Sequence, residues 1–389
     1  MSFTLNRDAQ EIPRARLAAE LARRIAHKKS VIWQEREQKY GENRAWVRAY
    51  PEPLAFTEIF GFDMNRFYED PAFALETELR QRIFWEDNVI EDSAATLVIP
   101  VGASIYFDHT LFGQAVTHDP SGVPRFGGHA LTDRADPALI PAFDFRHTGL
   151  MPQLLQMHTE MTRLAREWYG DAVKVVFPAI GRGPLDFFVQ MRGYESFVMD
   201  IAENPDGVRA CLLRFAQERS RFNAECAAYL GEPFARKNCF IADDWINVPF
   251  ISPQNFLELV LPSYRAIEEQ EGPINSFHTC GNMVPLSRDF CASFPELANL
   301  DVSAWNDLAA LDAEVPRERS FGVNISATMV MSAGVEEQRA HLELIRRLRR
   351  NRSIGLNAQS GCRIRASYDE HIARLNEYLL LARETLAHE

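Results

Sequence analysis

From about residue 93 onward, short apolar runs rich in β-branched residues recur along the chain, and longer amphipathic stretches separate several of them. The runs are TLVIPVG (96–102), VKVVFPAIG (173–181), NCFIADD (238–244), INSFHTC (274–280), NLDVSA (299–304), SFGVNIS (320–326) and SIGLNAQS (353–360). Candidate helices lie at about 150–169, 204–229, 252–270, 334–350 and 367–386. Mostly apolar strands that alternate with helices indicate a parallel sheet covered on both faces.

A series of seven such strands favours a (β/α)₈ TIM barrel with one strand unrecognised over an open, doubly wound sheet. No GxGxxG pattern follows the first strand, which weakens the case for a dinucleotide-binding fold. We therefore predict an α/β barrel over 91–389. Residues 1–90 are aromatic-rich, with helical periodicity at about 12–28 and 73–88. We predict that they form an extension or cap on the barrel; ordinary packing around one larger domain is the alternative.

Composition excludes several classes of function. The net charge is −12, from 42 basic and 54 acidic residues, and the one basic cluster, at 344–352, belongs to an apparent amphipathic helix. Nucleic-acid binding needs a basic surface and is disfavoured. No window is apolar enough for a membrane span, and the N-terminus lacks the apolar core of a signal peptide. The six cysteines form no disulfide pattern, so we predict a cytoplasmic protein.

The segment FHTCGN (277–282) contains a candidate metal site. On a strand, His278 and Cys280 point to the same side, and Gly281 lets the chain turn away directly afterwards. Cys362 follows the last candidate strand and also adjoins a glycine. The carboxyl ends of barrel strands lie close together, so these three residues can bind zinc. The alternative is a hydrogen-bonded histidine beside small buried cysteines. The other cysteines are predicted to be structural: Cys211, Cys226, Cys239 and Cys291.

Two aspartates end another candidate strand, and we predict that at least one faces the barrel mouth. Asp243 and Asp244 are candidate catalytic residues, and either one could act as a fourth metal ligand, an orienter of His278 or a substrate contact. Helix capping or ion pairing is the alternative for each.

Residues around the last strand are candidates for substrate binding. Arg363 and Arg365 directly follow Cys362 and could pair with a substrate carboxylate, although a solvated or acid-paired loop arginine is the alternative. Gln359 is a further candidate for substrate binding. The other polar residues at strand ends are weaker candidates: Asp301, Asn324 and Asn357.

Several segments together resemble the uroporphyrinogen decarboxylase superfamily, in its corrinoid-dependent methyltransferase branch. They occur in the family's order and cover roughly 90–389: GPLDFFVQMRGYESFVMDIAENPDGVRACL (183–212), IADDWINVPFISPQNFLELVLPSYRAI (241–267), FHTCGN (277–282) and SGCRI (360–364). The resemblance implies a zinc (β/α)₈ barrel with a His-x-Cys…Cys triad, matched by His278, Cys280 and Cys362. Porphyrin decarboxylases carry an RQAGR signature near the N-terminus and lack this triad. The signature is absent here, so porphyrin decarboxylation is disfavoured.

The resemblance implies a zinc-dependent methyltransferase that acts with the cobalamin of a separate corrinoid carrier protein. Zinc could present a thiol acceptor as a thiolate, or it could polarise the oxygen of a methyl ether during O-demethylation. An aromatic methyl ether is a candidate methyl donor. No DxHxxG cobalamin pattern occurs in the chain. Two alternatives stay open: a decarboxylase-like lyase that acts on a carboxylated substrate, and a non-catalytic ligand-binding barrel.

Overall fold

The computed structural model describes residues 4–33, 47–50, 53–118, 123–234, 238–359 and 367–387. Its strands are β1 (Val47–Tyr50), β2 (Val98–Pro100), β3 (Val116–His118), β4 (Pro124–Phe126), β5 (Lys174–Val176), β6 (Cys239–Ala242), β7 (Ile274–Thr279), β8 (Asn299–Val302), β9 (Ser320–Ile325) and β10 (Ile354–Gln359). Each of the seven apolar runs found in the sequence contains one of these strands.

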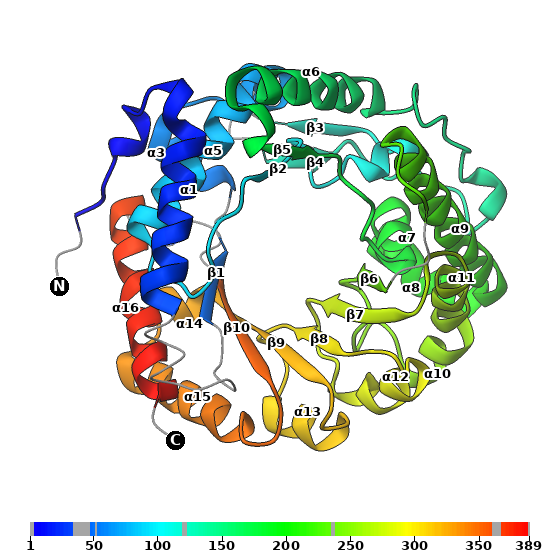
Figure 1. The fold of residues 1–389 in the computed structure, drawn as a ribbon. Helices are drawn as coiled ribbons and strands as arrows, with labels where there is room; N and C mark the ends of the chain where they lie inside the picture. Colours follow the sequence, from blue (N-terminus) through cyan, green and yellow to red (C-terminus); the bar gives the residue numbers. More distant parts are fainter. Residues whose placement is uncertain are drawn as a thin grey trace.

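Helices connect the strands and cover the outside of the structure (Figure 1). The α-helices are α1 (Leu17–His27), α3 (Pro53–Phe60), α4 (Met64–Glu69), α5 (Pro71–Asn88), α6 (Met151–Tyr169), α7 (Pro184–Arg192), α8 (Tyr194–Glu203), α9 (Pro205–Tyr229), α10 (Pro253–Asn255), α11 (Leu261–Glu271), α12 (Ser287–Ser293), α13 (Leu308–Glu314), α14 (Ala327–Met331), α15 (Val335–Leu348) and α16 (Tyr368–Ala387). None of these described helices is long and apolar enough to cross a membrane.

Six strands form one parallel sheet, in the order β1-β10-β9-β8-β7-β6. Figure 1 shows the strands around a central axis with the helices outside them. The prediction of a parallel, barrel-like α/β fold is therefore confirmed. A continuous ladder around all eight parallel strands is not shown, because β2 pairs with β5 in a separate parallel sheet.

Among the eight described parallel strands, β1 is the one that the apolar pattern did not reveal, and the short antiparallel pair of β3 and β4 was not predicted either. Strand β1 is only four residues long and contains Arg48, so it lacks an apolar run. It pairs in parallel with β10, with Arg48 opposite Asn357. Part of the predicted N-terminal extension thus contributes to the main sheet, while the domain boundary at residue 90 stays a prediction.

Strands β7 to β10 alternate between an apolar outer face and a polar inner face. The outward residues Phe277, Leu300, Val323 and Leu356 are buried against the surrounding helices. The inward positions are small or polar, and they line a cavity of about 640 Å³: Ser276, His278, Asn299, Asp301, Ser320, Gly322, Asn324, Gly355, Asn357 and Gln359. The interior of a TIM barrel is usually filled by large branched side chains. Here the interior keeps room for a ligand.

A buried arginine supports the junction between β5 and β6, where the described backbone forms only an isolated bridge from Arg182 to Ala242. Arg219 of α9 donates hydrogen bonds to the carbonyls of Ile180, which follows β5, and of Phe240 in β6. The same guanidinium lies 3.4 Å from the carboxylate of Glu271. Arg219 thus holds the two chain segments together where no ladder does.

We predict that Arg219→Met lowers the free energy of unfolding by about 3–5 kcal/mol, because it leaves the buried carboxylate of Glu271 with one less partner and removes the guanidinium donor from the carbonyls of Ile180 and Phe240. The same change at Arg209, on α9, is the control. Arg209 pairs with Asp206 on the surface, where an ion pair contributes about 0–1 kcal/mol. Urea unfolding of both variants measures the difference. Equal stabilities would contradict the role given to Arg219.

Candidate metal centre

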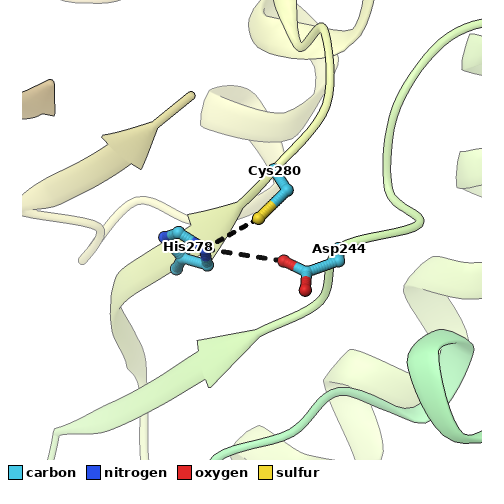
Figure 2. Close-up of side chains that lie close together, drawn as sticks. All are labelled: Asp244, His278 and Cys280. Carbon is cyan, nitrogen blue, oxygen red and sulfur yellow. Dashed lines mark hydrogen bonds and ion pairs between the residues drawn. The ribbon is translucent and has the colours of Figure 1, made fainter. Parts of the chain in front are cut away.

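Three candidate ligands meet where β6 and β7 end. The strands are in parallel register with Ala242 beside His278, and the backbone amide of Asp243 donates to the carbonyl of His278 at 2.9 Å. This pairing places Asp244 and Cys280, each in the loop just past its strand, at one edge of the sheet. Figure 2 shows Asp244, His278 and Cys280 directed toward one point.

The separations between the ligand atoms suit a tetrahedral metal ion. The Nε2 atom of His278 lies 3.4 Å from Sγ of Cys280 and 3.5 Å from Oδ1 of Asp244, and the three atoms all lie within 4.8 Å of one another. Zinc bonds of about 2.0–2.3 Å in a tetrahedral arrangement place neighbouring ligand atoms about 3.4–3.6 Å apart. Two of the three separations therefore match a zinc site closely.

His278 is held in the orientation that a metal ligand needs. Its Nδ1 lies 2.8 Å from Oδ2 of Asp301, the residue beside it in register on β8. Asn324 donates to the other oxygen of Asp301 at 2.8 Å. Gly322 makes room for this carboxylate, since a Cβ there would lie 2.7 Å from Oδ1 of Asp301. A carboxylate on Nδ1 leaves Nε2 facing the metal position, as is usual for histidine ligands.

The charges around this point favour a cation. Burial raises the pKa of the Cys280 thiol, and the nearby carboxylates of Asp244, Asp186 and Asp301 raise it further. Burial lowers the pKa of His278, but the hydrogen bond with Asp301 and the surrounding carboxylates outweigh that effect, so its pKa is raised. Oδ1 of Asp244 is buried and accepts no hydrogen bond from the described residues. The site is therefore rich in negative charge and in donor atoms, so the residues present fit a divalent metal ion.

The two neighbouring aspartates have different surroundings. Asp243 is fully buried, and its Oδ2 accepts hydrogen bonds from the hydroxyl of Tyr264 at 2.9 Å and from the amide of Leu185 at 3.1 Å. These hydrogen bonds link α7 and α11 to the end of β6, and the catalytic role predicted for Asp243 stays a prediction. Asp244 is the one of the pair that reaches the metal position. Its sequence-based interpretation as a fourth ligand agrees with this geometry.

Three of the predicted site residues, Cys362, Arg363 and Arg365, lie outside the described residues. Their roles stay predictions. Gln359, the last residue of β10, lines the barrel cavity together with His278.

Sequence reasoning missed a buried ionic network beside the metal position. Arg182 pairs with Asp108 at 3.0 Å and with Asp186, and Gln190 donates to Asp186 at 3.0 Å. Burial raises the pKa of Asp186 to about 6, although Arg182 opposes this shift. The sequence carried one indication of this network: Arg182 and Asp186 are four residues apart, directly after a predicted strand. The position of Asp108 carried no such signal, because only the fold brings it to Arg182.

A second cavity, of about 620 Å³, opens at the mouth of the site. Asp244, Cys280 and Gln190 lie on its wall together with three aromatic residues: Trp245, Phe250 and Trp305. Trp245 packs against Phe250 with ring centroids 5.0 Å apart, while Trp305 is 80% exposed. The three candidate ligands thus lie between the polar interior of the barrel and an aromatic mouth.

Comparisons with known proteins bear on the fold. No protein-family model matches the chain. No curated protein matches it either. Solved structures do match, and one of them is a methyltransferase from Methanosarcina mazei. The match has a TM-score of 0.60 and 15% sequence identity, and it covers 88% of this chain and 94% of that chain. At this identity the likeness concerns the fold, and it agrees with the barrel-like parallel architecture described above.

Proposed function

We propose that this chain is a zinc-dependent methyltransferase that moves a methyl group between a small methylated substrate and the cobalamin of a separate corrinoid protein. The observation that carries the proposal is the convergence of His278 Nε2, Cys280 Sγ and Asp244 Oδ1 at one point. The likeness in fold to a methyltransferase over nearly the whole chain supports it. Cys362 completes the ligand set that the sequence resemblance implies.

The ligand residues give the site its reactivity. Zinc, when bound by them, supplies a Lewis acid that lowers the pKa of a thiol or polarises an ether oxygen. Asp301 keeps the proton of His278 on Nδ1, so that Nε2 can donate its lone pair. Cys280 would hold the metal as a thiolate, and its proton would be released when the metal is bound.

The surrounding residues bind the substrate and exclude water. The aromatic side chains at the mouth suit an apolar substrate, and we therefore favour O-demethylation of an aromatic methyl ether over methylation of a thiol. Burial raises the pKa of the Asp186 carboxyl, and this residue lies in a network that reaches the mouth through Gln190. Asp186 is therefore a candidate proton donor or acceptor for the reaction.

We predict one zinc ion per chain in the purified protein and its loss in His278→Ala, Cys280→Ser and Cys362→Ser, because each change removes a ligand atom. The matched control is Cys291→Ser, since Cys291 is buried in α12, away from the metal position. Elemental analysis by mass spectrometry measures zinc per chain. Metal-free wild-type protein, or full zinc content in the ligand variants, would contradict the proposal.

The carboxylate of Asp301 should strengthen zinc binding although it is not itself a ligand. We predict that Asp301→Asn lowers zinc affinity by about 10–100-fold, because Nδ1 of His278 loses its anionic partner. Asp206→Asn, an exposed change on α9, is expected to leave affinity unchanged. Competition with a fluorescent chelator gives the affinities. Wild-type affinity in Asp301→Asn would show that this carboxylate does not tune the site.

Methyl transfer itself can be followed with free cobalamin. Zinc-loaded protein mixed with Co(I) cobalamin and methoxybenzenes should produce methylcobalamin, seen in the visible spectrum. His278→Ala should be slower by about a hundredfold or more, because several kcal/mol of oxygen polarisation are lost. In the opposite direction, a thiol should consume methylcobalamin. If zinc-loaded protein supports neither reaction with any compound tried, methyl transfer is contradicted and a lyase or binding barrel is favoured.

A further inference from the structure

A large cavity lies at the seam between β1 and β2, where the described strands form no ladder. Its volume is about 770 Å³, within the range typical of small-molecule sites. Ala49 of β1 lies on one side, and the segment from Pro100 to Ile105 lies on the other. Helices α3, α4 and α5 close the outside. We call this space the seam cavity. None of the three candidate metal ligands lines it.

Aromatic side chains make up much of its wall: Phe56, Phe67, Tyr68, Trp85 and Phe107. Their packing makes the wall rigid. Phe56 meets Trp85 edge to face with centroids 6.2 Å apart, and Phe67 meets Tyr68 in the same way at 6.0 Å. Rings held in this manner present preformed faces and edges to a flat apolar ligand.

Arg48 supplies a positive charge at the inner end of the seam cavity. It lines both this cavity and the polar interior of the barrel, and it is solvent-exposed. The side chain has no ion pair or hydrogen bond with any described residue. An arginine with no anionic partner in the described part of the chain is notable where the net charge is −12. A guanidinium of this kind is well suited to a carboxylate, which it can bind through two parallel hydrogen bonds.

The two carboxylates on the cavity wall bond to other groups, and neither forms an ion pair with Arg48. Glu78 pairs with Arg82 on the same helix. Glu91 accepts hydrogen bonds from the indole of Trp85 at 2.6 Å and from the amide of Ala49 at 3.2 Å.

Gln81 offers a further polar contact in the seam cavity. This side chain is 8% exposed, and its Nε2 donor has no hydrogen-bond partner among the described residues. A buried amide without a partner costs stability, and a ligand oxygen would remove that cost.

We propose that the seam cavity is a second small-molecule site, which binds an aromatic carboxylate: its ring system packs among the aromatic side chains and its carboxylate pairs with Arg48. Gln81 donates a hydrogen bond to an oxygen of this ligand. The site is separate from the described part of the metal centre, because none of Asp244, His278 and Cys280 lines its wall. Because Arg48 also lines the interior cavity, the carboxylate of such a ligand would lie at the side of the seam cavity that faces the barrel interior.

Isothermal titration calorimetry with 2-naphthoate and its neutral amide tests this site. The carboxylate should bind one per chain and at least about tenfold more tightly than the amide, because only the carboxylate forms a charge-assisted pair with Arg48. Arg48→Met should reduce the affinity for naphthoate to that for the amide and leave amide binding unchanged. Arg209→Met, on the surface of α9, should bind both compounds as the wild type does.

Two further variants separate the possible outcomes. Ala103→Phe fills the seam cavity and should abolish binding of both compounds. His278→Ala should bind naphthoate normally, which distinguishes failure of the metal centre from failure of this site. Absence of naphthoate binding up to about 10 mM, which corresponds to a binding free energy weaker than about −3 kcal/mol, overturns the proposal. Equal binding of naphthoate by Arg48→Met and wild type overturns it as well.

Discussion

The candidate metal centre depends on one hydrogen bond, between Nδ1 of His278 and Asp301 on the adjacent strand. Parallel register sets these two residues side by side, and Gly322 on the next strand leaves space for the carboxylate between them. Because Asp301 occupies Nδ1, the ring turns Nε2 toward Asp244 and Cys280. The pairing of β7 with β8 thus sets the orientation of the His278 ring, and the loops after β6 and β7 supply Asp244 and Cys280.

The polar interior of the barrel is the other condition for function. Small and polar residues at inward positions on β7 to β10 give up the packing energy of a filled barrel. The outward faces of the same strands carry apolar residues that are buried under the helices, and this burial supplies much of the stability. The two faces of these strands therefore differ in role. The outward apolar residues stabilise the fold, and the inward polar residues surround a space that can hold a ligand.

Much of the fold could be predicted from the chain alone. The seven runs indicated strands because they are short, mostly apolar and rich in β-branched residues, as strands buried in a parallel sheet are. Strand β1 escaped recognition because it is short and carries Arg48, so its identity depends on pairing with β10. The same reasoning found His278, Cys280 and Asp244 at strand ends. It did not identify Asp301 as the residue that orients His278, since only the register between β7 and β8 makes them neighbours.

The sequence by itself determined the alternation of strands and helices and placed His278 and Cys280 where one strand ends, because apolar runs and turn residues are local features of the chain. Tertiary structure alone decided which of two adjacent aspartates reaches the metal position. Asp243 is buried against Tyr264 and Leu185, whereas Asp244 faces His278, and this difference arises where α7 and α11 pack against the end of β6. It likewise decided that Asp108 meets Arg182, and that a cavity opens between β1 and β2. Contacts between segments so far apart depend on how the helices and strands pack, which no local pattern encodes.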